Sequence, residues 1–216
     1  MRKVFEHYTD FEDCRIGSTI ALASKVHKRE IVPDVFEYTV DLKWDAALAR
    51  EQNAEVAVLF LLPCKDLQYM WHPDCRARRV LDADWRLNIH SMLTDSAPVA
   101  MLFNGAGLST YTFAIDEVRK VTSVEFGVKD EGGSSHISGK IQMGLKQFDS
   151  QDHTTLRIRA DYRRVPCQEA LDAVRAWWEE TLHITPMPVP DAARKPVYSS
   201  WYNYHKDIDA STLGKR

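Results

Sequence analysis

The segment Phe36-Glu-Tyr-Thr-Val-Asp-Leu-Lys-Trp44 decides the fold class, because apolar and polar residues alternate along its whole length. A period of two places every second side chain on the same face of a β-strand. One face of the segment is therefore apolar and the other polar, as in an antiparallel sheet that is covered on one side only. The pattern predicts a strand whose polar face is in contact with water.

The same alternation recurs in segments 111–115, 124–128, 141–145 and 156–162. Val56 to Leu62 is apolar on both faces, so we expect a central strand there. Segments 85–90 and 97–104 show a weaker strand pattern, and turn-forming residues such as Asn104-Gly105 and Gly132-Gly133 separate the strands. Roughly nine or ten short strands with this spacing predict an all-β fold, an antiparallel β-sandwich.

One helix is predicted over about 166–182, with Pro166 at the first helical position, where its missing N–H has no cost. Apolar residues then recur at helical spacing, at Ala170, Leu171, Val174, Trp177, Trp178 and Leu182. We expect the tryptophan pair to pack against the sandwich or a neighbouring domain rather than to contact a ligand.

The character of the chain changes after this helix. We therefore place a sandwich domain at 1–184 and a proline-rich, extended linker at 185–195, since Thr185 to Pro190 contains three prolines. Segment 197–204 is compatible with a buried strand, and a helix begins near Asp209. Residues 196–216 then form the first β-α step of an incomplete α/β domain.

Charge and composition argue against several classes of partner. The chain of 216 residues has a formal charge of −3, which gives no electrostatic reason to expect binding to nucleic acid or to an anionic membrane. The N-terminal residues lack the apolar region of a signal peptide, and the longest apolar run, Val56 to Pro63, is too short to span a bilayer. The four cysteines form no C-x-x-C pair, so we expect free thiols and a cytoplasmic protein.

No motif points to a metal, a cofactor or a nucleophile. The eight histidines lack metal-binding spacing, and the chain has no G-x-S-x-G sequence. The glycine pairs lack the lysine of a phosphate-binding loop. We therefore expect neither a metal site nor a cofactor.

Two aromatic stretches remain as candidates for ligand binding. The first, Tyr69-Met-Trp71-His-Pro73, is predicted to lie between strands, where Trp71 either stacks on the apolar face of a sugar or closes the open end of the sandwich. The second, Ser199-Ser-Trp201-Tyr202-Asn203-Tyr204-His205, fits the first strand of a (β/α)₈ barrel, in which strand ends form the active-site floor. A short aromatic tail docked on the sandwich is the alternative for this second stretch.

Taken in order, these features resemble the α-galactosidases of glycoside hydrolase family 36. The resemblance rests on a long β domain, a helix with the pair Trp177-Trp178, a proline-rich linker and the segment Pro196-Val-Tyr-Ser-Ser-Trp-Tyr-Asn-Tyr-His205. In residue detail it covers about the last twenty positions and, more loosely, the segment around Trp71. It implies a supersandwich-like β domain followed by a catalytic (β/α)₈ barrel.

The resemblance further implies an enzyme that hydrolyses terminal α-galactosides or related oligosaccharides with retention of configuration and without a cofactor. Trp201 and Tyr202 would line the sugar subsite, and Trp71 would be the tryptophan that the β domain contributes, in this family often across the interface of a homo-oligomer. The family's two catalytic aspartates would lie after Arg216, so no catalytic residue is assigned to this chain, and Asp207 and Asp209 are expected to be solvated or capping residues. A non-catalytic carbohydrate-binding or interaction β-sandwich is the alternative function.

Overall fold

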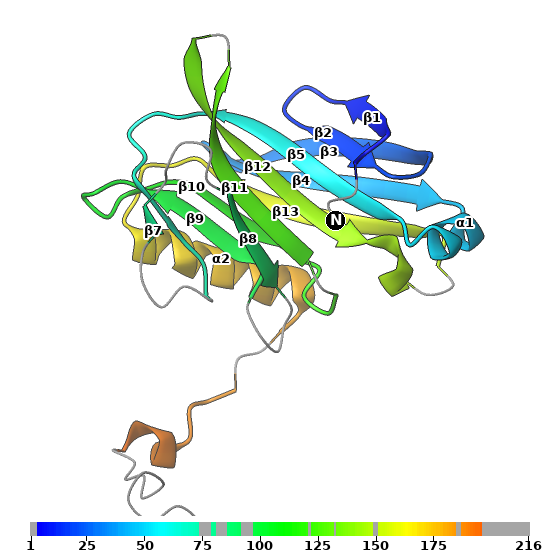
Figure 1. Cartoon of the computed structure of the whole chain (residues 1–216). Coiled ribbons are helices and arrows are strands. Elements are labelled where there is room, and N and C mark those ends of the chain that lie inside the picture. Colours follow the sequence, from blue (N-terminus) through cyan, green and yellow to red (C-terminus); the bar gives the residue numbers. More distant parts are fainter. Residues whose placement is uncertain are drawn as a thin grey trace, which may run out of the picture. The chain divides into compact units, whose positions relative to one another are not determined.

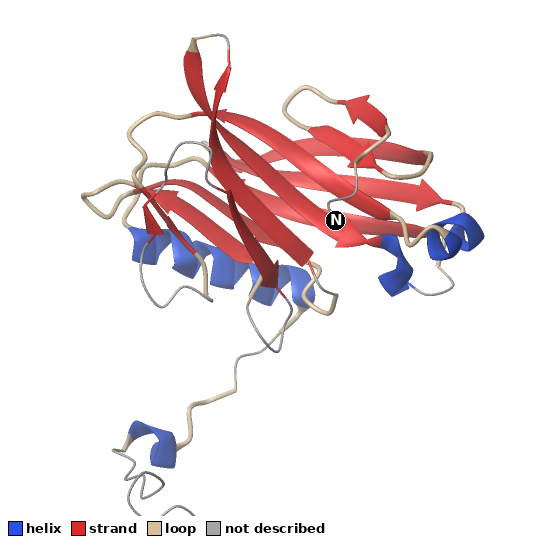
Figure 2. Cartoon of the chain, in the orientation of Figure 1, coloured by secondary structure: helices blue, strands red, loops and turns tan. Residues whose placement is uncertain are grey.

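The structure is a computed structural model that describes residues 4–73, 79–80, 86–91, 97–120, 122–131, 133–148, 151–184 and 187–195. Strands dominate these residues and form two antiparallel sheets (Figure 2). Among the described residues, no helix is both long enough and apolar enough to cross a membrane. The predicted class, mostly antiparallel β, is confirmed.

Within the described residues, one sheet contains six strands. Their order across the sheet is β1 (His7–Asp10), β2 (Arg15–Ser18), β5 (Glu55–Pro63), β12 (Ser134–Gly144), β11 (Thr122–Glu131) and β8 (Arg86–Ser91). Strand β5 lies between β2 and β12, which confirms that the doubly apolar segment 56–62 is a central strand.

The second sheet contains seven strands within the same residues. Their order is β3 (Leu22–Val32), β4 (Val35–Trp44), β13 (His153–Asp161), β10 (Ser109–Ile115), β9 (Val99–Phe103), β6 (Tyr69–Trp71) and β7 (Arg79–Val80). The helical elements are α1 (Ala46–Glu51), α2 (Cys167–Leu182) and two 3₁₀ turns, Leu145–Phe148 and Asp191–Arg194.

The main core contains apolar side chains from both sheets. Along β4 every second residue from Tyr38 to Trp44 is buried in this core, as the alternation predicts, and the partly buried Phe36 packs against it. Phe113 of β10 packs against two phenylalanines of the six-stranded sheet, Phe60 and Phe126, with ring centroids 5.2 and 5.4 Å apart. These contacts join the two sheets through closely packed aromatic rings.

Helix α2 lies along the face of the seven-stranded sheet that points away from the main core, beside β9 and β10 (Figure 1). It starts one residue later than predicted, because Pro166 is its N-cap, and it ends at His183 in the left-handed conformation with φ 52°. The expectation that the polar face of this sheet is wet is wrong beneath the helix, where Glu37, Arg159 and Asp161 are buried.

Several elements had not been predicted from the sequence. Strand β3 is exposed along most of its length, because it is an edge strand and so lacks a clean apolar face. Helix α1 has only six residues and is held by the Asp45 carboxylate, which accepts a hydrogen bond from the N–H of Leu48 at 2.9 Å. The 3₁₀ turn Asp191–Arg194 interrupts the segment predicted as an extended linker.

The chain divides into two compact units, residues 1–183 and residues 184–216. The first unit contains both sheets and α2. In the second unit, residues 187–190 have no regular secondary structure. The predicted β-α step at 196–216 lies outside the described residues.

Gly139 of β12 offers a direct test of core packing. A Cβ atom added there would lie 2.8 Å from Cε1 of Phe126, a fully buried ring, so one of the two must shift. We expect Gly139→Ala to lower the free energy of unfolding by about 1–3 kcal/mol, measured by urea denaturation. Gly144→Ala on the same strand is the control, because its Cβ would meet only Nε2 of Gln147 at 3.8 Å. Equal effects of the two substitutions would contradict this packing.

Candidate functional site

Of the three predicted sugar-contacting residues, only Trp71 lies in the described part of the chain. It is the last residue of β6, it pairs with Met101 of β9, and it is partly buried. Trp201 and Tyr202 lie outside the described residues.

Trp71 belongs to the contact between α2 and the sheet. A small second core forms there from Val99, Ala114, Val174 and Trp177, and Trp71 packs against it. Part of the Trp71 side chain stays accessible at the edge of this cluster. The residue is therefore supported by apolar contacts and still has surface to offer to a ligand.

Two indole groups attach α2 to the sheet. Nε1 of Trp177 donates a hydrogen bond to Oε2 of Glu37 on β4 at 2.8 Å, and Nε1 of Trp178 donates to the carbonyl oxygen of Ile115 at 2.9 Å. Glu37 also accepts a hydrogen bond from Nη2 of Arg29 at 3.0 Å. The expectation that the tryptophan pair packs against the β domain is confirmed.

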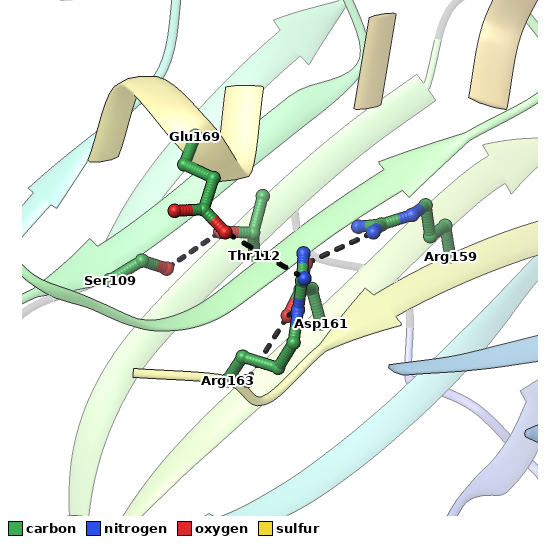
Figure 3. Close-up of polar contacts among 6 residues, drawn as sticks. All are labelled: Ser109, Thr112, Arg159, Asp161, Arg163 and Glu169. Atoms are coloured by element: carbon green, nitrogen blue, oxygen red, sulfur yellow. Dashed lines mark hydrogen bonds and ion pairs between the residues drawn. The ribbon is translucent and has the colours of Figure 1, made fainter. Parts of the chain in front are cut away.

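A network of charged groups lies beneath the first half of α2 (Figure 3). Oδ2 of Asp161 accepts hydrogen bonds from Arg159 at 3.0 Å and from Arg163 at 2.7 Å, and Arg163 also approaches Glu169 of the helix at 3.9 Å. Thr112, which pairs with Asp161 across β10 and β13, bonds to Ser109 at 2.8 Å.

Two opposing effects set the ionisation of Asp161. Burial alone would raise its pKa, but the hydrogen bonds from Arg163 and the charge of Arg159 outweigh burial and hold the pKa below its ordinary value. The carboxylate is therefore charged and doubly paired at neutral pH, so it has no proton to donate. Nη1 of Arg159 is buried without a hydrogen-bond partner in the described residues. The network has the chemistry of a structural ion cluster.

The described residues give no support for a metal site or for a reactive thiol. No group of three or more His, Cys, Asp or Glu side chains there could hold a metal ion. Cys14, Cys64 and Cys167 are free, as predicted. Burial raises the pKa of Cys14 to about 11 and also raises that of Cys167, so both thiols stay protonated at neutral pH and are poor nucleophiles.

A groove of about 690 Å³ lies between the segment 10–15 and the end of β5, and Ser138 and Gly139 of β12 also line it. Sequence reasoning missed it, because Leu61 belongs to a run that reads as a fully buried strand. In the structure β2 pairs with β5 only as far as Leu59, and Leu61 is 52% exposed. The available signal was Pro63, since proline in a sheet marks an edge or a strand end.

Asp161 provides a test of the ion cluster. Asp161→Ala leaves two guanidinium groups without their carboxylate, so we expect a loss of about 3–5 kcal/mol in the free energy of unfolding at pH 7. Glu169→Gln is the matched control, because Glu169 is 56% exposed and 3.9 Å from the same Arg163; it should cost less than about 1 kcal/mol. In the unchanged chain this stabilisation is complete above about pH 3.8 and is lost as the pH falls further. Similar losses for both variants would refute the assignment.

Asp116, next to Ile115, should make the free energy of unfolding depend on pH in the opposite direction. Burial raises its pKa to about 6, although its Oδ1 accepts the N–H of Arg157 at 2.8 Å. The folded state therefore resists ionisation, and stability should fall by roughly 1–3 kcal/mol between about pH 4 and pH 6. Asp116→Asn keeps the hydrogen-bond acceptor and cannot ionise. The free energy of unfolding of this variant, measured across the same pH range, should therefore not decline. A decline of unchanged size in the variant would show that Asp116 is not its source.

Comparisons with models of known protein families, with curated proteins and with solved structures each found no match for this chain. Two regions of the described β domain offer surface to a ligand, the partly exposed Trp71 beside α2 and the groove along β5.

Proposed function

We propose that this chain is the N-terminal β domain of an α-galactosidase-like glycoside hydrolase of family 36, which cleaves terminal α-galactosides. The observation that carries the proposal is the order of its parts. Two antiparallel sheets come first, the helix α2 with Trp177 and Trp178 follows, and a segment with several prolines leads to Pro196–His205. This order supports the proposal, because it is the order of parts on which the resemblance to this family rests.

The attachment of α2 supports this assignment in physical terms. Two indole hydrogen bonds and a small apolar core fix the helix on the sheet, so the chain leaves the first unit from a rigid element at His183. Proline residues at 188 and 190 stiffen the chain that follows.

In the proposed enzyme, aromatic residues of this chain hold the sugar and carboxylates of a barrel perform the chemistry. Trp201 and Tyr202 would stack on the apolar face of the galactose ring, and Trp71 would add a third aromatic surface, from the same or a neighbouring subunit of a homo-oligomer. Retention of configuration requires two carboxyl groups about 5–5.5 Å apart, one as nucleophile and one as general acid/base. We assign neither role to a carboxylate of this chain, and we place the protein in the cytoplasm because its described cysteines are free thiols.

Activity of the full-length product of the gene that encodes this chain tests the proposal. We expect it to hydrolyse p-nitrophenyl α-galactoside and to release α-galactose first, as seen by ¹H NMR. Trp201→Ala should lower kcat/KM by at least about 10²-fold, because the ring that positions the sugar is lost. Glu180→Gln is the control, since it changes an exposed acid on α2 and should leave kcat/KM nearly unchanged.

Failure to hydrolyse any α-galactoside would remove the enzyme proposal. β-Galactose as the first product would exclude the retaining mechanism. The alternative function, a non-catalytic carbohydrate-binding or interaction domain, would then stand, and the groove along β5 is the observation that favours it.

A further inference from the structure

The groove along β5 is a feature that the proposed hydrolase does not use. One wall is the segment 10–15, which contains the turn between β1 and β2, and the other is the end of β5 with Ser138 of β12. Tyr162, which follows β13 of the other sheet, also lines it. Its volume of about 690 Å³ falls in the range of roughly 300–1,000 Å³ that is typical of small-molecule sites.

Backbone groups of Leu61 face this groove. The N–H of Cys64 bonds to Ser135 on β12, whereas the carbonyl of Glu55 accepts the N–H of Thr19 on the other side of β5. Since backbone groups alternate in direction along a strand, the odd-numbered residues of β5 point away from β12. Pairing with β2 ends at Leu59, so the N–H and C=O of Leu61 are turned to the groove, where no described strand pairs with them.

Aromatic and hydroxyl groups add to these backbone groups. Phe11 is partly buried in the wall of the groove, and the Leu61 side chain is 52% exposed, so apolar surface is present. The Tyr162 hydroxyl lies 3.4 Å from that of Tyr38, which is long for a hydroxyl pair. Burial raises the pKa of Tyr162 to about 12, so this hydroxyl stays neutral and can donate a hydrogen bond to a better placed acceptor.

The charges of the groove largely neutralise one another. Asp10 pairs with Arg15, Asp13 pairs with Lys28 at 2.6 Å, and the lining also contains the cation Lys129. Glu12 is exposed and has no ion pair with a described residue. Paired charges provide hydrogen-bonding atoms without a strong field, so the lining favours a neutral polar ligand over a highly charged one.

A peptide strand is a poorer fit than a sugar. Strand addition uses a row of free N–H and C=O groups on the edge of a sheet. Here β2 already covers Leu59, and Pro63 has no N–H, so Leu61 alone remains on this part of the edge. A sugar needs only a few separate donors and acceptors beside an apolar surface.

We propose that the groove between segment 10–15 and the end of β5 is a non-catalytic binding site for a short neutral oligosaccharide. Its apolar C–H face would lie on Phe11 and Leu61, and its hydroxyl groups would bond to Glu12, Ser138, Tyr162 and the backbone of Leu61. The site is independent of Trp71, Trp201 and Tyr202, and the inference does not rest on the hydrolase proposal.

NMR titration of the ¹⁵N-labelled chain with maltotriose and with raffinose tests this site. We expect saturable shifts of the amide signals of Phe11, Leu61 and Ser138 with at least one of the two sugars. Glu12→Gln should weaken binding by roughly tenfold, because it removes the charge of an acceptor. Phe11→Ala should weaken it by about fivefold to tenfold through loss of the ring surface. Glu180→Gln, an exposed acid on α2, should leave binding unchanged.

Three outcomes would overturn the proposal: no shift with either sugar, shifts confined to residues outside the groove, or the same affinity in Glu12→Gln as in the unchanged chain. Shifts of Leu61 with an extended pentapeptide of alternating threonine and valine, and none with sugars, would assign the groove to peptide binding instead. The spectra also show whether each variant is folded. If Phe11→Ala is misfolded, the affinity of Glu12→Gln alone tests the site. Loss of α-galactoside hydrolysis with intact groove binding would remove the hydrolase proposal alone.

Discussion

The attachment of α2 to the seven-stranded sheet is the contact on which the organisation of this chain depends. The helix covers a face that carries Glu37, Arg159 and Asp161, three groups that are costly to bury without partners. Each finds one, Glu37 through the indole N–H of Trp177 and the other two through each other. The sheet therefore has apolar packing on one face and paired charges under the helix on the other, and the chain leaves the domain from a fixed point.

Alternation along single strands predicts much of this fold. Residues 36–44 and 156–162 indicate strands and their core-facing side chains, because a strand with one apolar face has a clear period of two. The same pattern gives a wrong prediction for the opposite face. It predicts that Arg159 and Asp161 are exposed to solvent, but both are buried because a helix distant in the sequence covers them. Edge strand β3 is missed for the related reason that neither of its faces is well buried.

The candidate sites depend on contacts between segments that are far apart in the sequence. Trp71 reads as a loop residue, yet it ends a strand and packs beside a helix about a hundred residues later. Leu61 reads as buried, yet it is exposed because it alternates with the core residues Phe60 and Leu62 and so lies on the outer face of its sheet. Strand termination and helix docking are tertiary events, so no local pattern encodes them. The resemblance that suggests a hydrolase rests on aromatic spacing and on the order of the parts, which the sequence does display.

A covalent sugar adduct tests most directly the proposed membership of this chain in a retaining α-galactosidase family. The full-length gene product would be incubated with an activated fluorinated α-galactosyl fluoride, which a retaining enzyme converts into a slowly hydrolysed glycosyl ester. We predict that mass spectrometry finds one fluorogalactosyl group per protein, on an aspartate outside the β domain. No adduct under conditions in which the protein is folded, or an adduct on a residue of the β domain, would contradict the account.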